Sequence, residues 1–209
     1  MIKRILFISP RIALQKGDFL GSGIPYWPFE MAITAAFARN WGHVVDVIDL
    51  FGAGPQTLQD FGDHYMQGEP LQKSADRIRS FEADLIVIYG LSYMSHSEIC
   101  RILQELKRLG LMAKLAVLEN SQAVTAFALP SVKDNLFQAG SDALICGEAY
   151  WNWDEILQGI ENSNSEATNL LLKEFPQKKI ERKIKLDGEY PVPAWDLFDL
   201  KNYWSLPYA

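Results

Sequence analysis

The sequence predicts an α/β protein with a doubly wound, flavodoxin-like, five-stranded parallel sheet and an extended C-terminal tail. Three observations support this fold class. Short apolar runs alternate with longer segments of helical periodicity as far as residue 161. The runs are apolar at nearly every position, as expected for strands that are buried on both faces of a parallel sheet. The chain has 209 residues, 48% of them hydrophobic, which is enough to bury one sizeable core.

The predicted elements follow one another in a regular order. The strands are apolar or β-branched runs, at residues 5–8, 44–49, 84–89, 114–118 and 142–146. The helices have apolar residues three or four positions apart, at residues 28–39, 71–81, 97–109, 131–138 and 151–160. Because helices separate the strands, the strands are expected to be parallel. Two stretches rich in glycine and polar residues, 11–26 and 51–68, are predicted loops.

Two of the helices have the clearest signals. Pro28 suits the first position of the first helix, because its missing N–H would have no partner there. Gly42 is expected to end that helix. Its inward face is predicted to consist of Phe29, Ile33, Ala36 and Phe37. The inward face of the third helix is predicted to consist of Ile99, Ile102, Leu103 and Leu106.

Residues 1–161 are predicted to form one domain, and residues 162–209 an extended linker. The linker begins with a polar stretch, 162–166, and then alternates in charge over 178–185. Its last part is interrupted by proline and contains the aromatic residues Trp195, Phe198, Tyr203 and Trp204. Because an extended segment with this much aromatic surface needs a surface to pack on, we predict self-association through the tail.

The composition limits the kinds of partner that this chain is expected to bind. Twenty Lys and Arg residues against 26 Asp and Glu residues give a formal charge of −6 without a basic stripe, which disfavours nucleic acid as a partner. No apolar stretch approaches the ~18 residues of a membrane span, and the first apolar run ends without a signal-peptide cleavage site. Cys100 and Cys146 lie in apolar contexts typical of core positions in a reducing compartment. The sequence therefore favours a cytoplasmic protein.

The sequence contains no common catalytic or metal-binding pattern. Its histidines lack the spacing of metal ligands: His43, His64 and His96. Neither cysteine has a neighbour that would activate it as a nucleophile. The glycines after the first strand match neither a P-loop nor a dinucleotide fingerprint: Gly17, Gly21 and Gly23.

The candidate site follows from the fold class. In a doubly wound sheet, ligands bind outside the carboxyl ends of the strands, near the topological switch point. Gly147-Glu148 would bring backbone N–H groups and a carboxylate to this edge. Ser92 and Tyr93 would either contact a ligand or cap the following helix. The candidate binding residues are Ser9, Pro10, Gly90, Leu91, Ser92, Tyr93, Glu119, Asn120, Ser121, Gly147 and Glu148.

The order and spacing of these landmarks resemble the N-terminal cobalamin-binding domain of cobalamin-dependent radical S-adenosylmethionine enzymes. The resemblance covers nearly the whole chain and depends on the set of segments rather than on any one motif. The matching segments are 5–10, 24–39, 41–49, 83–92 and 143–149, followed by Pro191-Val192-Pro193-Ala194-Trp195-Asp196-Leu197-Phe198-Asp199-Leu200.

The resemblance implies a corrin ring on the carboxyl edge of the sheet, with no protein histidine as the lower ligand of cobalt. Ser92, Tyr93 and the Gly147-Glu148 loop would line the corrin, and the segment 119–122 would lie near its nucleotide tail. The chemistry of the intact enzyme would be methyl transfer. The three-cysteine motif for an iron–sulfur cluster is absent. The cluster, S-adenosylmethionine and the catalytic barrel would therefore belong to a longer parent or to a partner chain.

Two alternatives stay open. Relatives have a Gly-Gly pair after the fourth strand, where this chain has Glu119-Asn120, so side chains would stand where a corrin tail approaches the backbone. This departure favours a cofactor-free interaction module with the same fold. The N-terminal half, with Gly42-His43-Val44 at the end of its helix, also resembles the first lobe of a two-lobed glycosyltransferase, whose second lobe is missing here.

Overall fold

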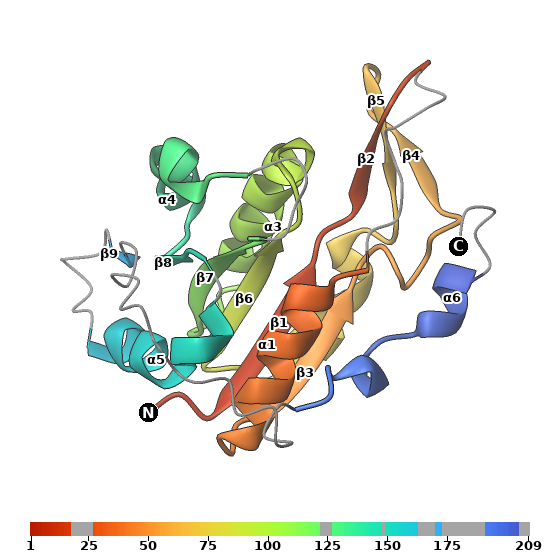
Figure 1. Cartoon of the computed structure of the whole chain (residues 1–209). Helices are drawn as coiled ribbons and strands as arrows, with labels where there is room; N and C mark the ends of the chain where they lie inside the picture. Colours follow the sequence, from red (N-terminus) through yellow and green to blue (C-terminus); the bar gives the residue numbers. More distant parts are fainter. Residues whose placement is uncertain (18–26, 122–126, 148, 163–169, 173–190, 205–209) are drawn as a thin grey trace.

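The parallel sheet predicted from the sequence forms the centre of the protein. The computed structural model describes residues 1–17, 27–121, 127–147, 149–162, 170–172 and 191–204. The six parallel strands lie side by side in the order β3-β1-β6-β7-β8-β9 (Figure 1). They are β1 (Arg4–Ser9), β3 (Val44–Asp49), β6 (Leu85–Gly90), β7 (Lys114–Glu119), β8 (Ala143–Ile145) and β9 (Leu170–Leu172).

The first five strands of this order are the five predicted ones, arranged as in a flavodoxin-like sheet. The predicted α/β fold class is therefore confirmed. The short strand β9, which comes from the predicted linker, pairs in parallel with β8 and was not predicted. Three residues that pair at the far edge of a sheet give little local signal in the sequence.

Helices cover both faces of the sheet. α1 (Phe29–Asn40) and α5 (Trp153–Asn162) pack on the face that receives Ile5 and Phe7 of β1. The opposite face receives Leu6 and Ile8 and packs against α2 (Ala75–Phe81), α3 (His96–Arg108) and α4 (Lys133–Ala139). Short 3-10 segments accompany these helices: η1 (Leu71–Ser74), η2 (Tyr93–Ser95), η3 (Leu129–Val132) and η4 (Ala149–Asn152). All five predicted helices are present. Their ends are shifted by up to two residues, except that the first four residues predicted for the second helix form η1 and α2 begins at Ala75.

A small antiparallel sheet replaces parts of two predicted loops, so the prediction of loops at 11–26 and 51–68 was wrong there. β2 (Ile12–Gln15), β5 (His64–Gln67) and β4 (Leu58–Asp60) pair in the order β2-β5-β4. The sheet extends from the carboxyl end of β1 (Figure 1). Its strands are short and half polar, and β2 pairs with a partner about 50 residues away, so no local periodicity indicates the pairing.

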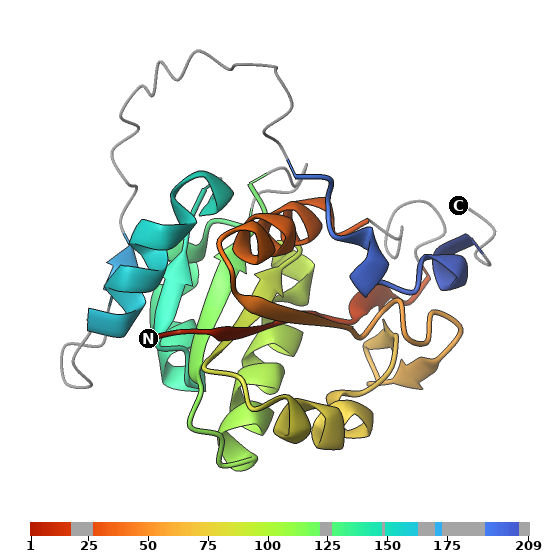
Figure 2. The ribbon, with the colours of Figure 1, turned by 90° about the horizontal axis from the view of Figure 1, so that it is seen from below.

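The first helix is buried on more sides than predicted. Its buried residues include Glu30, Met31, Thr34 and Ala35 as well as Ile33 and Ala36, whereas Phe29, predicted to point inward, is 44% exposed. One contribution comes from the segment 191–204, which runs beside α1 (Figure 2). The Ala194 N–H donates to the Ala32 carbonyl at 3.0 Å, so α1 lies between the sheet and the tail.

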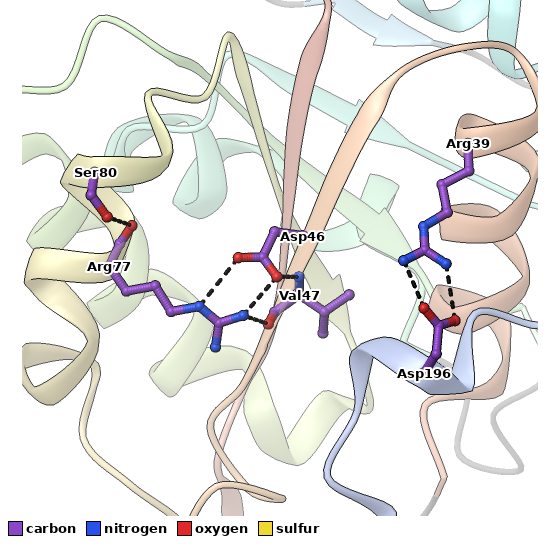
Figure 3. Close-up of polar contacts among 6 residues, drawn as sticks. All are labelled: Arg39, Asp46, Val47, Arg77, Ser80 and Asp196. Carbon is purple, nitrogen blue, oxygen red and sulfur yellow. Dashed lines mark hydrogen bonds and ion pairs between the residues drawn. The ribbon is translucent and has the colours of Figure 1, made fainter.

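The C-terminal tail packs on the domain through charged, apolar and hydrogen-bonding contacts. The Arg39 guanidinium donates two hydrogen bonds, of 2.9 and 2.8 Å, to the Asp196 carboxylate (Figure 3). η5 (Trp195–Leu197) and α6 (Leu200–Trp204) follow. The Tyr203 hydroxyl donates to Asp49 Oδ2 at 2.6 Å, which brings α6 to the carboxyl end of β3. On the other side of β3, Asp46 is paired with Arg77 of α2 at 2.6 Å (Figure 3).

Two of the tail's aromatic residues, which were predicted to need a surface to pack on, pack on the domain of the same chain. Phe198 and Tyr203 are 8% and 2% exposed, whereas Trp204 is 66% exposed. Self-association through the tail stays a prediction, and it now depends mainly on Trp204. Within the described residues, no helix combines the length and the apolar character needed to cross a bilayer.

Candidate functional site

The loops after β6, β7 and β8 meet at the carboxyl edge of the sheet, as predicted. Asn120 Nδ2 donates to the Leu91 carbonyl at 3.1 Å and so joins the β7 loop to the β6 loop. The Gly147 N–H donates to Glu119 Oε2 at 2.8 Å and joins the β8 loop to the end of β7. Side chains of the β7 loop therefore hold the neighbouring loops in place. Glu148 lies outside the described residues.

The two residues that stand in place of a Gly-Gly pair both have structural partners. Besides Gly147, the Glu119 carboxylate accepts a long hydrogen bond of 3.4 Å from the Leu129 N–H. Glu119 and Asn120 are half-buried. The acidic side chain thus spans the space between the β7, β8 and η3 segments, where the resemblance would place the nucleotide tail of a corrin.

The predicted site residues differ in access. Ser9, Pro10, Gly90 and Leu91 are buried. Gly90 is required for packing, since a Cβ there would lie 2.8 Å from the Leu118 carbonyl oxygen. These four residues are therefore packed inside the carboxyl edge of the sheet and do not form its accessible surface.

Tyr93 and Ser121 are exposed, and Ser92 and Gly147 are half-buried with groups that a ligand can reach. Ser92 is half-buried and extended, and its hydroxyl does not cap the following η2 or α3, so the alternative role as a helix cap is wrong. Tyr93 is 57% exposed. Gly147 has a φ of 72°, and a Cβ there would meet no atom within 4 Å. Together they present a hydroxyl, a phenol and an open backbone at one edge.

Glu30 is a site residue that the sequence analysis did not identify. It is 1% exposed, and its carboxylate accepts hydrogen bonds from the Ser121 N–H at 2.7 Å and the Ser121 hydroxyl at 2.9 Å. The start of α1 is thereby tied to the β7 loop. Burial, followed by the nearby Glu30 charge, raises the pKa of Tyr89 above its usual range. A single acidic residue within an apolar helix was the available signal in the sequence.

A second cluster lies at the topological switch point, between the carboxyl ends of β1 and β6. Arg11 Nε and one Nη donate to the two oxygens of Glu98 at 2.6 and 3.1 Å. The other Nη of Arg11 donates to Gln59 of β4 at 2.9 Å, and Arg101 donates to Glu98 Oε2 at 2.8 Å. The Arg11 and Glu98 side chains are 4% and 2% exposed. This buried pair was not predicted, because it joins residues 87 positions apart.

The described residues offer neither a metal centre nor an activated thiol. Within them, no group of three or more His, Cys, Asp or Glu side chains is placed to hold a metal ion. Cys100 and Cys146 are half-buried and do not form a disulfide, and burial raises the pKa of Cys100. His96 lies 3.8 Å from the Cys100 sulfur, and burial lowers the pKa of its imidazole. Cys100 is therefore not arranged as an activated nucleophile.

Comparison with known proteins does not assign a family. No protein-family model matches the chain, and no curated protein matches it. A similar solved structure is the signal receiver domain of a response regulator, NarL, from Mycobacterium tuberculosis, with 8% identity over 78% of this chain and 100% of that chain and a TM-score of 0.42.

Two further solved structures are similar over part of the fold. The β-glucosidase EmGH1 from Erythrobacter marinus has 15% identity over 56% of this chain and 20% of that chain, with a TM-score of 0.31. PhdJ, solved with a substrate intermediate, has 15% identity over 77% of this chain and 58% of that chain, with a TM-score of 0.29. At these levels of similarity, none of the three structures assigns a function.

Proposed function

We propose that this chain is a cobalamin-binding domain that holds the cofactor on the carboxyl edge of its parallel sheet, with no protein histidine as the lower cobalt ligand. The observation that carries the proposal is the joining of three edge loops by side-chain hydrogen bonds, Asn120 to Leu91 and Gly147 to Glu119. A corrin is a wide ring with amide side chains on its rim, and it needs a preorganised surface with several donors and acceptors.

The accessible residues suit the corrin side of such a site. The Ser92 hydroxyl and the Tyr93 phenol would form hydrogen bonds with the amide side chains of the corrin. The open space at Gly147 would let the ring approach the backbone. Glu119 would face the nucleotide tail. Its carboxylate holds two backbone N–H groups, so a bound tail would have to pack against it or displace it.

The tail of the chain supports the same proposal. α6 is fixed at the carboxyl end of β3 by the hydrogen bond from Tyr203 to Asp49. A catalytic domain that follows this segment in the intact enzyme would therefore be joined at the edge that would carry the cofactor. When bound, cobalamin supplies a methyl group for transfer, and this chain's residues would bind and orient it, whereas the iron–sulfur cluster and S-adenosylmethionine belong to a longer parent or a partner.

The test is reconstitution with hydroxocobalamin, followed by desalting and an absorption spectrum. We expect retention of about one corrin per chain, with a spectrum that lacks a histidine ligand to cobalt. Glu119→Gly should weaken binding by about tenfold, because it releases the Gly147 N–H and loosens the preorganised edge on which the proposal depends.

Glu82→Gly is the matched control. Glu82 lies at the opposite edge of the sheet and has a φ of 51°, so glycine suits it and corrin binding should not change. If the native protein does not retain the corrin, or if Glu119→Gly and Glu82→Gly both retain it as well as the native protein does, the proposal is wrong, and a cofactor-free interaction module becomes the better interpretation.

A further inference from the structure

We propose that the pocket at the topological switch point binds the phosphate or carboxylate group of a small molecule, with Arg101 as the residue that contacts it. The pocket has a volume of about 580 Å³ and lies between β4, η1 and α3. This volume is within the range of about 300–1,000 Å³ found for small-molecule sites. Arg11 follows β1 and α3 follows β6, and these adjacent strands lead to helices on opposite faces, so the pocket is at the position where doubly wound folds bind ligands.

The charges at the centre of the pocket do not cancel. Arg11 and Arg101 both donate to Glu98, so two guanidinium groups share one carboxylate. Two other charged lining residues already have partners, since Glu105 accepts from Arg108 at 3.1 Å and Lys73 pairs with Glu69 at 3.1 Å. Among the residues that the structure describes, one positive charge is left over beside a buried ion pair. An anion in the pocket would compensate this charge.

The position of Arg101 suits direct contact with an anion in the pocket. Within the described residues its only hydrogen bond goes to Glu98, although a guanidinium has five N–H donors. Its side chain is 36% exposed, and its guanidinium carbon lies 4.4 Å from the centre of the Phe61 ring. The ring and Glu98 hold the guanidinium at the pocket, and the planar fork of its N–H groups is suited to two oxygens of one oxyanion.

Arg11 has a positioning role in this proposal. Its three hydrogen bonds join the end of β1 to α3 and to β4, and it is nearly fully buried. Gly68 allows this packing, because a Cβ there would lie 3.0 Å from Arg11 Cγ and 2.6 Å from the Leu50 carbonyl oxygen. The arrangement holds Glu98 in place, and Glu98 in turn orients Arg101.

The pocket shares no lining residue with the loops after β6, β7 and β8 that are proposed to contact cobalamin. The side chains of the corrin are neutral amides, and the anionic group of cobalamin is the phosphodiester of its nucleotide tail, which the proposed site places beside Glu119 rather than beside Arg101. Loss of corrin binding in Glu119→Gly and loss of anion binding in Arg101→Gln therefore test the two proposals separately.

Calorimetric titration of the full chain with inorganic phosphate, pyrophosphate and succinate tests the proposal at low ionic strength. We expect saturable binding of at least one of the three, and Arg101→Gln should weaken it by about tenfold or more, as expected for the loss of charged hydrogen bonds. Binding of phosphate or pyrophosphate alone would identify a phosphate group as the ligand chemistry. Binding of succinate alone would identify a carboxylate.

The matched control is Arg79→Gln. Arg79 also pairs with an acidic residue three positions earlier, Asp76 at 3.2 Å, and neither of the two lines the pocket. Its loss should leave the affinity unchanged. Arg101→Lys, which keeps the charge but loses the fork of donors, should bind with intermediate affinity. Absence of binding for all three probes, or an equal effect of Arg101→Gln and Arg79→Gln, would overturn the proposal.

Discussion

Replacing Tyr203 tests whether the tail is an integral part of the folded domain. The ring of Tyr203 is 2% exposed. It stacks on Trp27 with ring centres 4.8 Å apart and meets the edge of Phe51 at 5.3 Å. Truncating a buried aromatic residue to alanine costs about 3–5 kcal/mol, so Tyr203→Ala should lower the free energy of unfolding by that amount. Tyr203→Phe keeps the ring and removes the hydrogen bond to Asp49, so it should cost about 1–3 kcal/mol.

Urea unfolding followed by tryptophan fluorescence measures these changes, and Trp204→Ala is the control. Trp204 is the next residue in the chain but is 66% exposed, and its truncation should change stability by less than about 0.5 kcal/mol. Amide hydrogen exchange in α6 shows whether the loss is confined to the tail. If Tyr203→Ala and Trp204→Ala have the same effect, the tail is not packed as described and the reasoning is refuted.

Two further predictions concern the ends of the strands. Burial raises the pKa of Asp49, so its contribution to stability should be fully present below its usual value of about 4 and be lost as the pH rises through the raised pKa. Urea unfolding across pH 3–8 should therefore show the native protein losing stability relative to Asp49→Asn as the pH rises, and a constant difference would contradict the assignment. Gly90→Ala should lower the thermal unfolding midpoint by several degrees, because its methyl group would lie 2.8 Å from the Leu118 carbonyl oxygen. An unchanged midpoint would show that the end of β6 can move away from β7.

The predicted strands and helices were found from the sequence because their signals are local. β3 coincides with the predicted 44–49, and the apolar face of α3 is buried as its periodicity predicts. Alternation of helices with apolar strands limits the chain order and direction of a parallel sheet to a few arrangements. That order also places the loops containing Ser92, Glu119 and Gly147 at one edge, so the meeting of these loops was predictable as well.

The tertiary structure decided which residues at that edge are accessible and which are tied to other groups. The sequence did not show that Gly90 packs against β7, that Glu119 holds the Gly147 N–H, or that Glu30 accepts from Ser121.

The same holds for the small sheet β2-β5-β4, for the packing of the tail on α1 and for the pair of Arg11 with Glu98. Apart from the local pairing of β4 with β5, these contacts join residues that are far apart in the chain. In a single sequence, the buried face of a helix or strand appears as a short repeating pattern of apolar residues. A contact with a distant residue leaves no such pattern, only an isolated polar or aromatic residue. Those partners are selected when the chain folds, because buried polar groups must be hydrogen-bonded and aromatic surfaces must be covered.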